Sequence, residues 1–262
     1  MTELEVARDE RGVATVTMNR PAVRNAFDDR LVGLLHDTAV ELARDDDVRV
    51  VVLTGAGDAF SAGADLQWMQ RAREASYEDN VADAMRLARM LQALDDLPKP
   101  LVGRVQGPAI GGGAGLVAVC DVAVAVAGAT FAFTEVALGL APAVIAPYVV
   151  RKVGRSFARS AFVTGARFGA PRAREVGLVH DVAADGAALD AAVAAVVDRC
   201  RRAGPQAVAV AKRLPDQAMG PLDDVAAEMA ELIAGLRAGA EGQAGMAAFL
   251  EGATPPWVAR DS

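Results

Sequence analysis

Hydrophobic positions along the chain change from a period of two to a period between three and four, and back again. Residues 13–18 alternate as in a strand, and residues 28–44 place leucines and alanines on one helix face, with Asp28 as the expected N-cap. Residues 48–53 form an apolar run that is typical of a buried parallel strand. This order predicts a βαβ unit, whose crossover is right-handed by default.

The alternation of strands and helices continues to about residue 185, after which the chain is helical. Further strands are expected at residues 101–105, 122–126, 131–133 and 178–182, and helices at 80–96, 111–120 and 171–177. Alanine-rich helices are then expected at 187–202, 205–214, 222–238 and 241–250. We therefore predict an α/β core over residues 1–190 and a helical region over 191–262, whose apolar faces need a neighbour to cover them.

Composition narrows the class of protein. The 262 residues are 53% hydrophobic and 23% charged, which excludes a disordered chain. A net charge of −7 argues against binding to nucleic acid or to an anionic membrane surface. The acidic N-terminus lacks the apolar core of a secretory signal, and the longest nearly uncharged stretch, 105–127, is interrupted by five glycines, a proline and an aspartate. We expect a cytoplasmic protein that does not enter a membrane.

The cysteines and histidines give no sign of a metal site. Cys120 and Cys200 form no CxxC pair, so neither a disulfide framework nor a cysteine zinc site is expected. His36 lies off the apolar stripe of its helix and is expected at the surface, while His180 is expected in a strand or at its rim.

Two glycine-rich segments follow predicted strands, where open α/β sheets bind ligands. Residues 54–66 can point backbone N–H groups into a cleft but lack the ending of a P-loop. Residues 106–116 place three consecutive glycines at the start of a helix, which suits either an oxyanion or close helix–sheet packing. The pattern Gly113-x-Gly115-x-x-Ala118, with Glu135 further on, matches a dinucleotide fingerprint only loosely, because no strand immediately precedes it.

A single carboxylate stands in the apolar segment 129–142. Burial of Glu135 would raise its pKa, which is what proton transfer near neutral pH requires. A structural carboxylate that caps a loop is the alternative.

Taken together, four segments resemble the enoyl-CoA hydratase/isomerase (crotonase) superfamily. They are Asn19-Arg20-Pro21 with Asn25-Ala26-Phe27, then residues 60–66, then Gly111-Gly112-Gly113, then residues 134–142. Their order and spacing fit, and the resemblance extends from residue 13 to residue 257. It implies an α/β fold built as a spiral of ββα repeats, with a helical C-terminal region that forms trimers, often paired into hexamers.

The resemblance also implies a site for an acyl-CoA thioester. The N–H groups of Ala64 and Gly112 would bind the thioester oxygen, and Glu135 would be the acid–base group. Further substrate contacts are implied at Arg24, which would meet a CoA phosphate or else be solvated, and at Ala26, Ala62, Asp65 and Leu66. Phe249 would contact the CoA of a neighbouring subunit, although the basic pair expected after it is replaced by Gly252-Ala253. No cofactor is expected, because coenzyme A is part of the substrate.

The main departure from the family pattern is Gly115. Hydratases with two carboxylates carry Glu at this position and a second Glu at the position of Glu135. With Glu135 alone, an enoyl-CoA hydratase is favoured, because residues 133–150 resemble a branch that also lacks the first Glu and hydrates 3-methylglutaconyl-CoA or related branched substrates. A Δ3,Δ2-enoyl-CoA isomerase and a non-catalytic acyl-CoA-binding protein are the alternatives.

Overall fold

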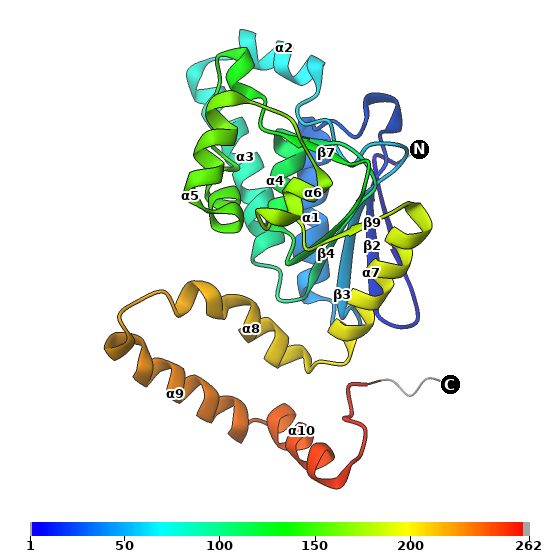
Figure 1. Ribbon diagram of the computed structural model, residues 1–262, viewed down its shortest axis with the longest axis vertical. Coiled ribbons are helices and arrows are strands. Elements are labelled where there is room, and N and C mark those ends of the chain that lie inside the picture. The colour runs from blue at the N-terminus through cyan, green and yellow to red at the C-terminus, as the bar shows by residue number, and fades with distance from the viewer. Residues whose placement is uncertain (1, 259–262) are drawn as a thin grey trace.

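Residues 2–258 are described by a computed structural model, in which a six-stranded sheet runs through the core (Figure 1). The strands are β1 (Leu4–Arg8), β2 (Val13–Met18), β3 (Val50–Gly55), β4 (Leu101–Val105), β6 (Val122–Val126) and β9 (Asp181–Ala183), in the order β1-β2-β3-β4-β6-β9. β1 pairs antiparallel with β2, and the other pairs are parallel. The predicted βαβ unit is therefore confirmed as β2, α1 (Asp29–Arg44) and β3.

A second, smaller sheet forms the other layer of strands. It contains β5 (Ala109–Ile110), β7 (Thr130–Ala132) and β8 (Phe168–Gly169). Two isolated bridges, Phe27 with Ala64 and Ser61 with Ala109, extend this layer towards the first glycine-rich segment. The two glycine-rich segments that are far apart in the sequence are thereby held side by side.

Helices cover both faces of the large sheet. Besides α1 they are α2 (Leu66–Glu74), α3 (Tyr77–Asp95), α4 (Gly112–Val119), α5 (Ala146–Thr164), α6 (Ala170–Glu175) and α7 (Gly186–Arg201). β3 is buried along its whole length: Val51 and Leu53 pack with α1, α3 and α4, while Val50 and Val52 pack with α7. Each fully buried aliphatic side chain contributes about 1.5–3 kcal/mol. Burial on both faces explains the apolar run in the sequence.

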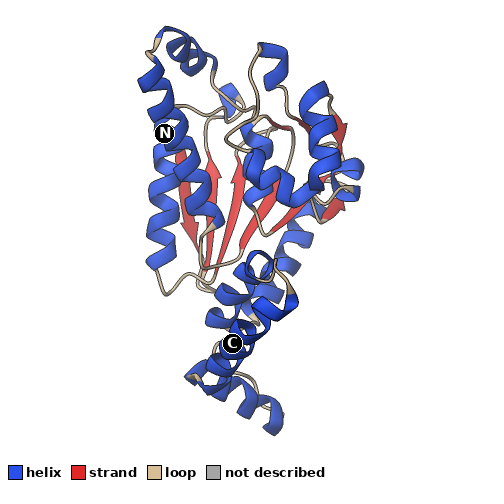
Figure 2. Cartoon of the chain, turned by 90° about the vertical axis from the view of Figure 1, so that its left-hand side faces the viewer, coloured by secondary structure: helices blue, strands red, loops and turns tan. Residues whose placement is uncertain are grey.

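The last three helices lie apart from the sheet, as Figures 1 and 2 show. They are α8 (Pro205–Gln217), α9 (Leu222–Ala238) and α10 (Ala240–Glu251), and α9 holds no buried side chain. Met219, Leu222, Phe249 and Leu250 are each more than 80% exposed. The Lys212 ammonium of α8 binds the Asp121 carboxylate of the core at 3.0 Å. Exposed apolar side chains on this scale are typical of an interaction surface. Association of subunits through this surface stays a prediction.

The boundary predicted at residue 190 falls inside α7. This helix is continuous and packs on β4, β6 and β9, so it belongs to the core, and the change in architecture follows Arg201. His36 is half-buried and contacts the Asp37 carboxylate at 3.0 Å, while His180 directly precedes β9 and accepts a hydrogen bond on Nδ1 from the Ala123 N–H. Within residues 2–258, no helix combines the length and hydrophobicity needed to cross a membrane.

Candidate active site

A cavity of about 430 Å³ opens between the start of α4, helix α2, and the segment that joins β7 to α5. Its lining consists of Phe27, Ala62, Gly63, Ala64, Leu66, Trp68, Met69, Leu87, Ile110, Gly111, Gly112, Thr134, Glu135, Leu138, Leu140, Ala141, Pro142, Ala143, Val144 and Ile145. Apart from one threonine and one glutamate, every lining side chain is apolar or absent. The size and character suit a small-molecule site.

Two backbone N–H groups border this cavity without a backbone acceptor among residues 2–258. The Phe27 N–H donates to the Gly63 carbonyl at 2.6 Å and the Asp65 N–H donates to the Phe27 carbonyl at 2.8 Å, so the intervening Ala64 N–H faces away from that strand pair. Gly112 is the first residue of α4, where a helix leaves its N–H groups unpaired. The segments meet closely, since a Cβ built on Gly63 would lie 3.7 Å from the Gly112 nitrogen.

The glycines at the start of α4 also serve close packing, which was the alternative interpretation of the segment. A Cβ on Gly112 would lie 2.8 Å from Cε2 of Phe27, and a Cβ on Gly113 would lie 2.5 Å from the Ser61 carbonyl oxygen. The close-packing interpretation is therefore confirmed, and the oxyanion interpretation stays a prediction. Glycine lets α4 approach the neighbouring loop, and that approach sets the Gly112 N–H beside Ala64.

An ionic cluster that sequence reasoning missed holds the first of these loops. The Arg20 guanidinium contacts the carboxylates of Asp28 at 3.0 Å and Asp65 at 3.1 Å, and donates to the Ala26 carbonyl at 2.6 Å. Asp28 caps α1, as predicted, and Asp65 caps α2. One arginine thus joins the N-caps of two helices immediately beside Ala64. Two N-capping aspartates near an Arg-Pro turn were the available signal.

The turn before α1 is supported by Asn25, which is fully buried. Its side-chain amide donates to the carbonyls of Ala56 and Ala59 at 2.9 and 2.8 Å, and its side-chain oxygen accepts from the Arg20 N–H. Arg24 and Asn25 both have left-handed backbone conformations, with φ of 52° and 55°. Such conformations persist where neighbouring contacts impose them, and they cluster at ligand sites.

Glu135 is half-buried at the cavity, at the first position of the short 3₁₀ turn η2 (Glu135–Leu138). Its carboxylate lies against Gly111, because a Cβ on that glycine would stand 3.1 Å from Oε1. Oε2 is buried and has no hydrogen-bond partner within the described residues. Burial raises the pKa of Glu135, and its own backbone N–H opposes this only in part. An unpartnered acid with a raised pKa beside the Gly112 amide is suited to proton transfer.

Gly115, where the resemblance implies a second acid in two-carboxylate hydratases, lies against Ile145. A Cβ on Gly115 would lie 2.3 Å from Cγ2 and 2.9 Å from Cβ of Ile145, which is 3% exposed. No side chain can stand at Gly115 unless Ile145 moves. Glu135 is the one ionisable residue of the described cavity lining.

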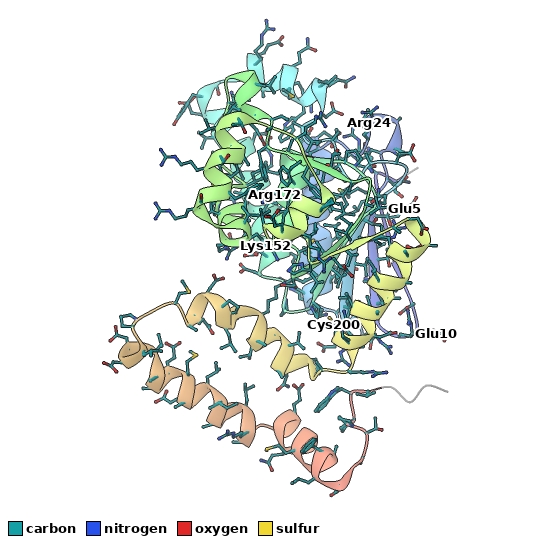
Figure 3. The ribbon with its side chains drawn as sticks, in the orientation of Figure 1. Glu5, Glu10, Arg24, Lys152, Arg172 and Cys200 are labelled. Carbon is teal, nitrogen blue, oxygen red and sulfur yellow. The ribbon has the colours of Figure 1, made fainter. Side chains whose placement is uncertain are left out.

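The remaining predicted substrate contacts are spread around this cavity. Ala62 and Leu66 line it, and Arg24 lies at the surface on the loop before α1, without an ion pair among the described residues (Figure 3). The side chains of Ala26 and Asp65 are buried, and that of Asp65 is used to cap α2 and bind Arg20. Their contacts with a substrate stay predictions.

Phe249 is 85% exposed on α10, at the opposite end of the molecule from α2 (Figure 1). Contact with a CoA in another subunit, as predicted, stays a prediction. Among residues 2–258, no group of three or more His, Cys, Asp and Glu side chains is placed to hold a metal ion.

Known proteins resemble this chain over nearly its whole length. The sequence profile of the enoyl-CoA hydratase/isomerase family matches residues 8–260. The 2,3-dehydroadipyl-CoA hydratase of Escherichia coli is 34% identical, with 99% of this chain and 100% of the relative covered. The enoyl-CoA hydratase ACTT6 of Alternaria alternata is 35% identical, with 92% and 79% covered. A crystal structure of an enoyl-CoA hydratase from Shewanella pealeana superposes with a TM-score of 0.94 at 36% identity, covering 98% and 96% of the two chains.

Proposed function

The chain belongs to the enoyl-CoA hydratase/isomerase family, and from this premise we propose that it adds water across the 2,3 double bond of an enoyl-CoA with Glu135 as its sole acid–base group. Its fold is the crotonase fold, and its activity is of the enoyl-CoA hydratase type. The single-acid form of the reaction is supported by one observation above all. The Glu135 carboxylate lies against Gly111, the residue before Gly112, with Oε2 unpartnered among the described residues, while Ile145 fills the space next to Gly115.

In this proposal the N–H groups of Ala64 and Gly112 bind the thioester oxygen. Addition to the double bond places negative charge on this oxygen as the enolate forms, and both donors become more favourable in the transition state than in the bound substrate. One such donor typically contributes about 3–4 kcal/mol to lowering a barrier. Because both donors are main-chain groups, residues 60–66 and 111–113 need only small side chains.

Glu135 acts first as a base and then as an acid. Its carboxylate takes a proton from water, the water oxygen forms a bond to C3, and the electron pair of the C2–C3 double bond passes to the thioester as an enolate. The Glu135 carboxylic acid then returns its proton to C2, and the carbonyl is restored. Burial raises the pKa of Glu135, which makes its carboxylate a stronger base for the first step, and the carboxylic acid formed in that step is the proton donor of the second.

The same arrangement suits a second activity. A Δ3,Δ2-enoyl-CoA isomerase needs one group to take a proton from C2 and return it to C4, and a solitary Glu135 is sufficient for this. Hydration is placed first because the relatives are named hydratases. A protein that only binds acyl-CoA would have no use for a carboxylate whose buried Oε2 lacks a hydrogen-bond partner, which makes it the weakest of the three proposals.

We propose that the enzyme works without a cofactor, in the cytoplasm, as a homotrimer or homohexamer. The exposed apolar side chains of α8 to α10 support association, and the exposed side chain of Arg24, which has no ion pair among residues 2–258, supports a contact with a CoA phosphate. The finer substrate expected from the sequence is 3-methylglutaconyl-CoA. The apolar cavity wall supports its methyl branch but offers its terminal carboxylate no cation among the described lining residues.

Mass spectrometry of acyl-CoA products separates these proposals. The protein is incubated with 2-enoyl-CoA and 3-enoyl-CoA substrates in heavy water. Hydration adds the mass of one water to a 2-enoyl-CoA, isomerisation moves the double bond with exchange of deuterium, and a binding protein changes neither. The matched variants are Glu135→Gln and Glu78→Gln, the latter at an exposed acid of α3. Retained hydration in Glu135→Gln would overturn the proposed role.

A further inference from the structure

The far wall of the cavity is apolar and without a cation. Leu66, Trp68 and Met69 come from α2, Leu87 comes from α3, and Leu138, Leu140 and Val144 come from the segment between β7 and α5. No arginine, lysine or histidine is part of the described lining. The enclosed acid, Glu135, is itself an anion when it acts as a base.

Two arginines of the same helices, Arg71 of α2 and Arg86 of α3, face a separate cleft. A polar cleft of about 170 Å³ lies between α1, α2 and α3, and it shares only Trp68 with the acyl cavity. In it the Arg71 guanidinium binds the Asp29 carboxylate at 2.6 Å, and Arg86 binds Asp83 at 2.5 Å. These cations are therefore paired, and Asp79 adds a further negative charge to the cleft.

An acyl chain that ends in a carboxylate has no favourable place in such a cavity. Moving an ionised carboxylate from water to an apolar wall is costly unless a cation or several hydrogen-bond donors replace the water. A chain that ends in a methyl group gains from the same wall, because each buried methylene contributes about 0.8 kcal/mol. The free energy of moving the end of the chain into the cavity is therefore unfavourable for a carboxylate and favourable for a methyl group.

We propose that this cavity selects acyl-CoA thioesters with an uncharged, apolar acyl chain and discriminates against chains that end in a carboxylate. The proposal rests on the proposed function to the extent that the cavity holds the acyl part of the substrate. It narrows that function, since it favours neutral branched or straight chains over 3-methylglutaconyl-CoA.

Binding of saturated analogues tests the selection independently of turnover. Hexanoyl-CoA and adipoyl-CoA carry the same six-carbon chain and differ in a terminal methyl against a terminal carboxylate. Calorimetry with the full-length protein is expected to show adipoyl-CoA binding at least about thirty-fold more weakly than hexanoyl-CoA. Binding of the two within threefold of each other would overturn the proposal.

A cation introduced into the cavity wall tests whether the missing positive charge causes the discrimination against a terminal carboxylate. Met69 is half-buried in α2, and its replacement by lysine keeps a straight, helix-favouring side chain. Met69→Lys is expected to bring the two affinities within about fivefold, while the matched Met69→Gln keeps the preference for hexanoyl-CoA. The same ratio of hexanoyl-CoA to adipoyl-CoA affinity in Met69→Lys and Met69→Gln would show that charge in the cavity wall does not decide selection, and would overturn the proposal.

Turnover is measured separately with (E)-2-hexenoyl-CoA. If hydration is absent while hexanoyl-CoA is still preferred, the proposed function fails and the selection by the cavity stands. If hexenoyl-CoA is hydrated while adipoyl-CoA binds equally well, the selection fails and the proposed function stands.

Discussion

Replacement of Gly115 by alanine measures how firmly Ile145 occupies the place of a second acid. The added Cβ would lie 2.3 Å from Cγ2 of Ile145, and both residues are buried, so neighbouring atoms must shift. Overpacking of a well-filled core costs typically about 1–3 kcal/mol. The Cγ2 methyl group belongs to Ile145, the buried N-cap residue of α5, and has little freedom to move, which places the cost near the upper end. Alanine regains about 1 kcal/mol of helix propensity, so the expected net loss is about 2 kcal/mol.

Gly33 provides the matched control. It lies inside α1, and a Cβ on it would meet nothing within 4 Å. Gly33→Ala gains the same helix propensity without a clash and is expected to stabilise the protein by about 0.5–1 kcal/mol. Urea unfolding at one fixed protein concentration gives both changes, and the difference between the variants isolates the contact with Ile145. In thermal unfolding, a loss of about 2 kcal/mol corresponds to a decrease in Tm of roughly 4–8 °C.

A third variant separates this contact from other effects of the substitution. Ile145→Ala alone removes buried methyl groups and is expected to cost about 2–5 kcal/mol. In the double variant with Gly115→Ala the new methyl group enters the space that Ile145 vacates. The loss of stability in the double variant should therefore be about 0.5–3 kcal/mol smaller than the sum of the losses in the two single variants. Equal stability of Gly115→Ala and Gly33→Ala, or strict additivity in the double variant, would refute the close contact on which the single-acid interpretation depends.

The other predictions concern the acid and the loop that carries Ala64. Glu135→Gln should lower kcat by about 10²–10⁴-fold with little change in the Kd for an acyl-CoA, and a fall in affinity comparable to the fall in kcat would count against a purely chemical role. Because burial raises the pKa of Glu135 in the folded protein, wild type should lose stability relative to Glu135→Gln as pH rises from the pKa of the unfolded state to that of the folded state. Over the same pH range kcat/KM of the wild type should rise, because the carboxylate is the base. A pH-independent difference in the free energy of unfolding between the two proteins would contradict this. Arg20→Met removes the cation shared by the buried Asp65 carboxylate and the half-buried Asp28 carboxylate, and it should cost about 3–5 kcal/mol in urea unfolding, with partial recovery in Arg20→Lys; an unchanged unfolding midpoint would show that the cluster is not important for stability.

The strands and helices with a strong hydrophobic period were predictable, and those without one were not. β2 and α1 begin and end where the pattern indicates, because burial on one face dictates the period. β1 was missed because it is an edge strand with one buried residue in five and no apolar alternation. α5 was missed because Pro147 stands in its first turn and Gly154 interrupts it with a φ of 74°. Local sequence predicts only what local burial determines.

The same distinction applies to the active site. Glu135 and the glycines at 111–113 were visible because a lone acid in an apolar run and three consecutive glycines are unusual within a short window. The role of Ile145 depends on its contact with Gly115, thirty positions earlier in the chain, and an isoleucine in an apolar segment gives no local signal of such a contact. The Arg20 cluster likewise joins residues up to 45 positions apart. The proposed single-acid mechanism therefore rests on two features of different kind: an acid that the sequence reveals, and the contact between Ile145 and Gly115 that only the structure shows.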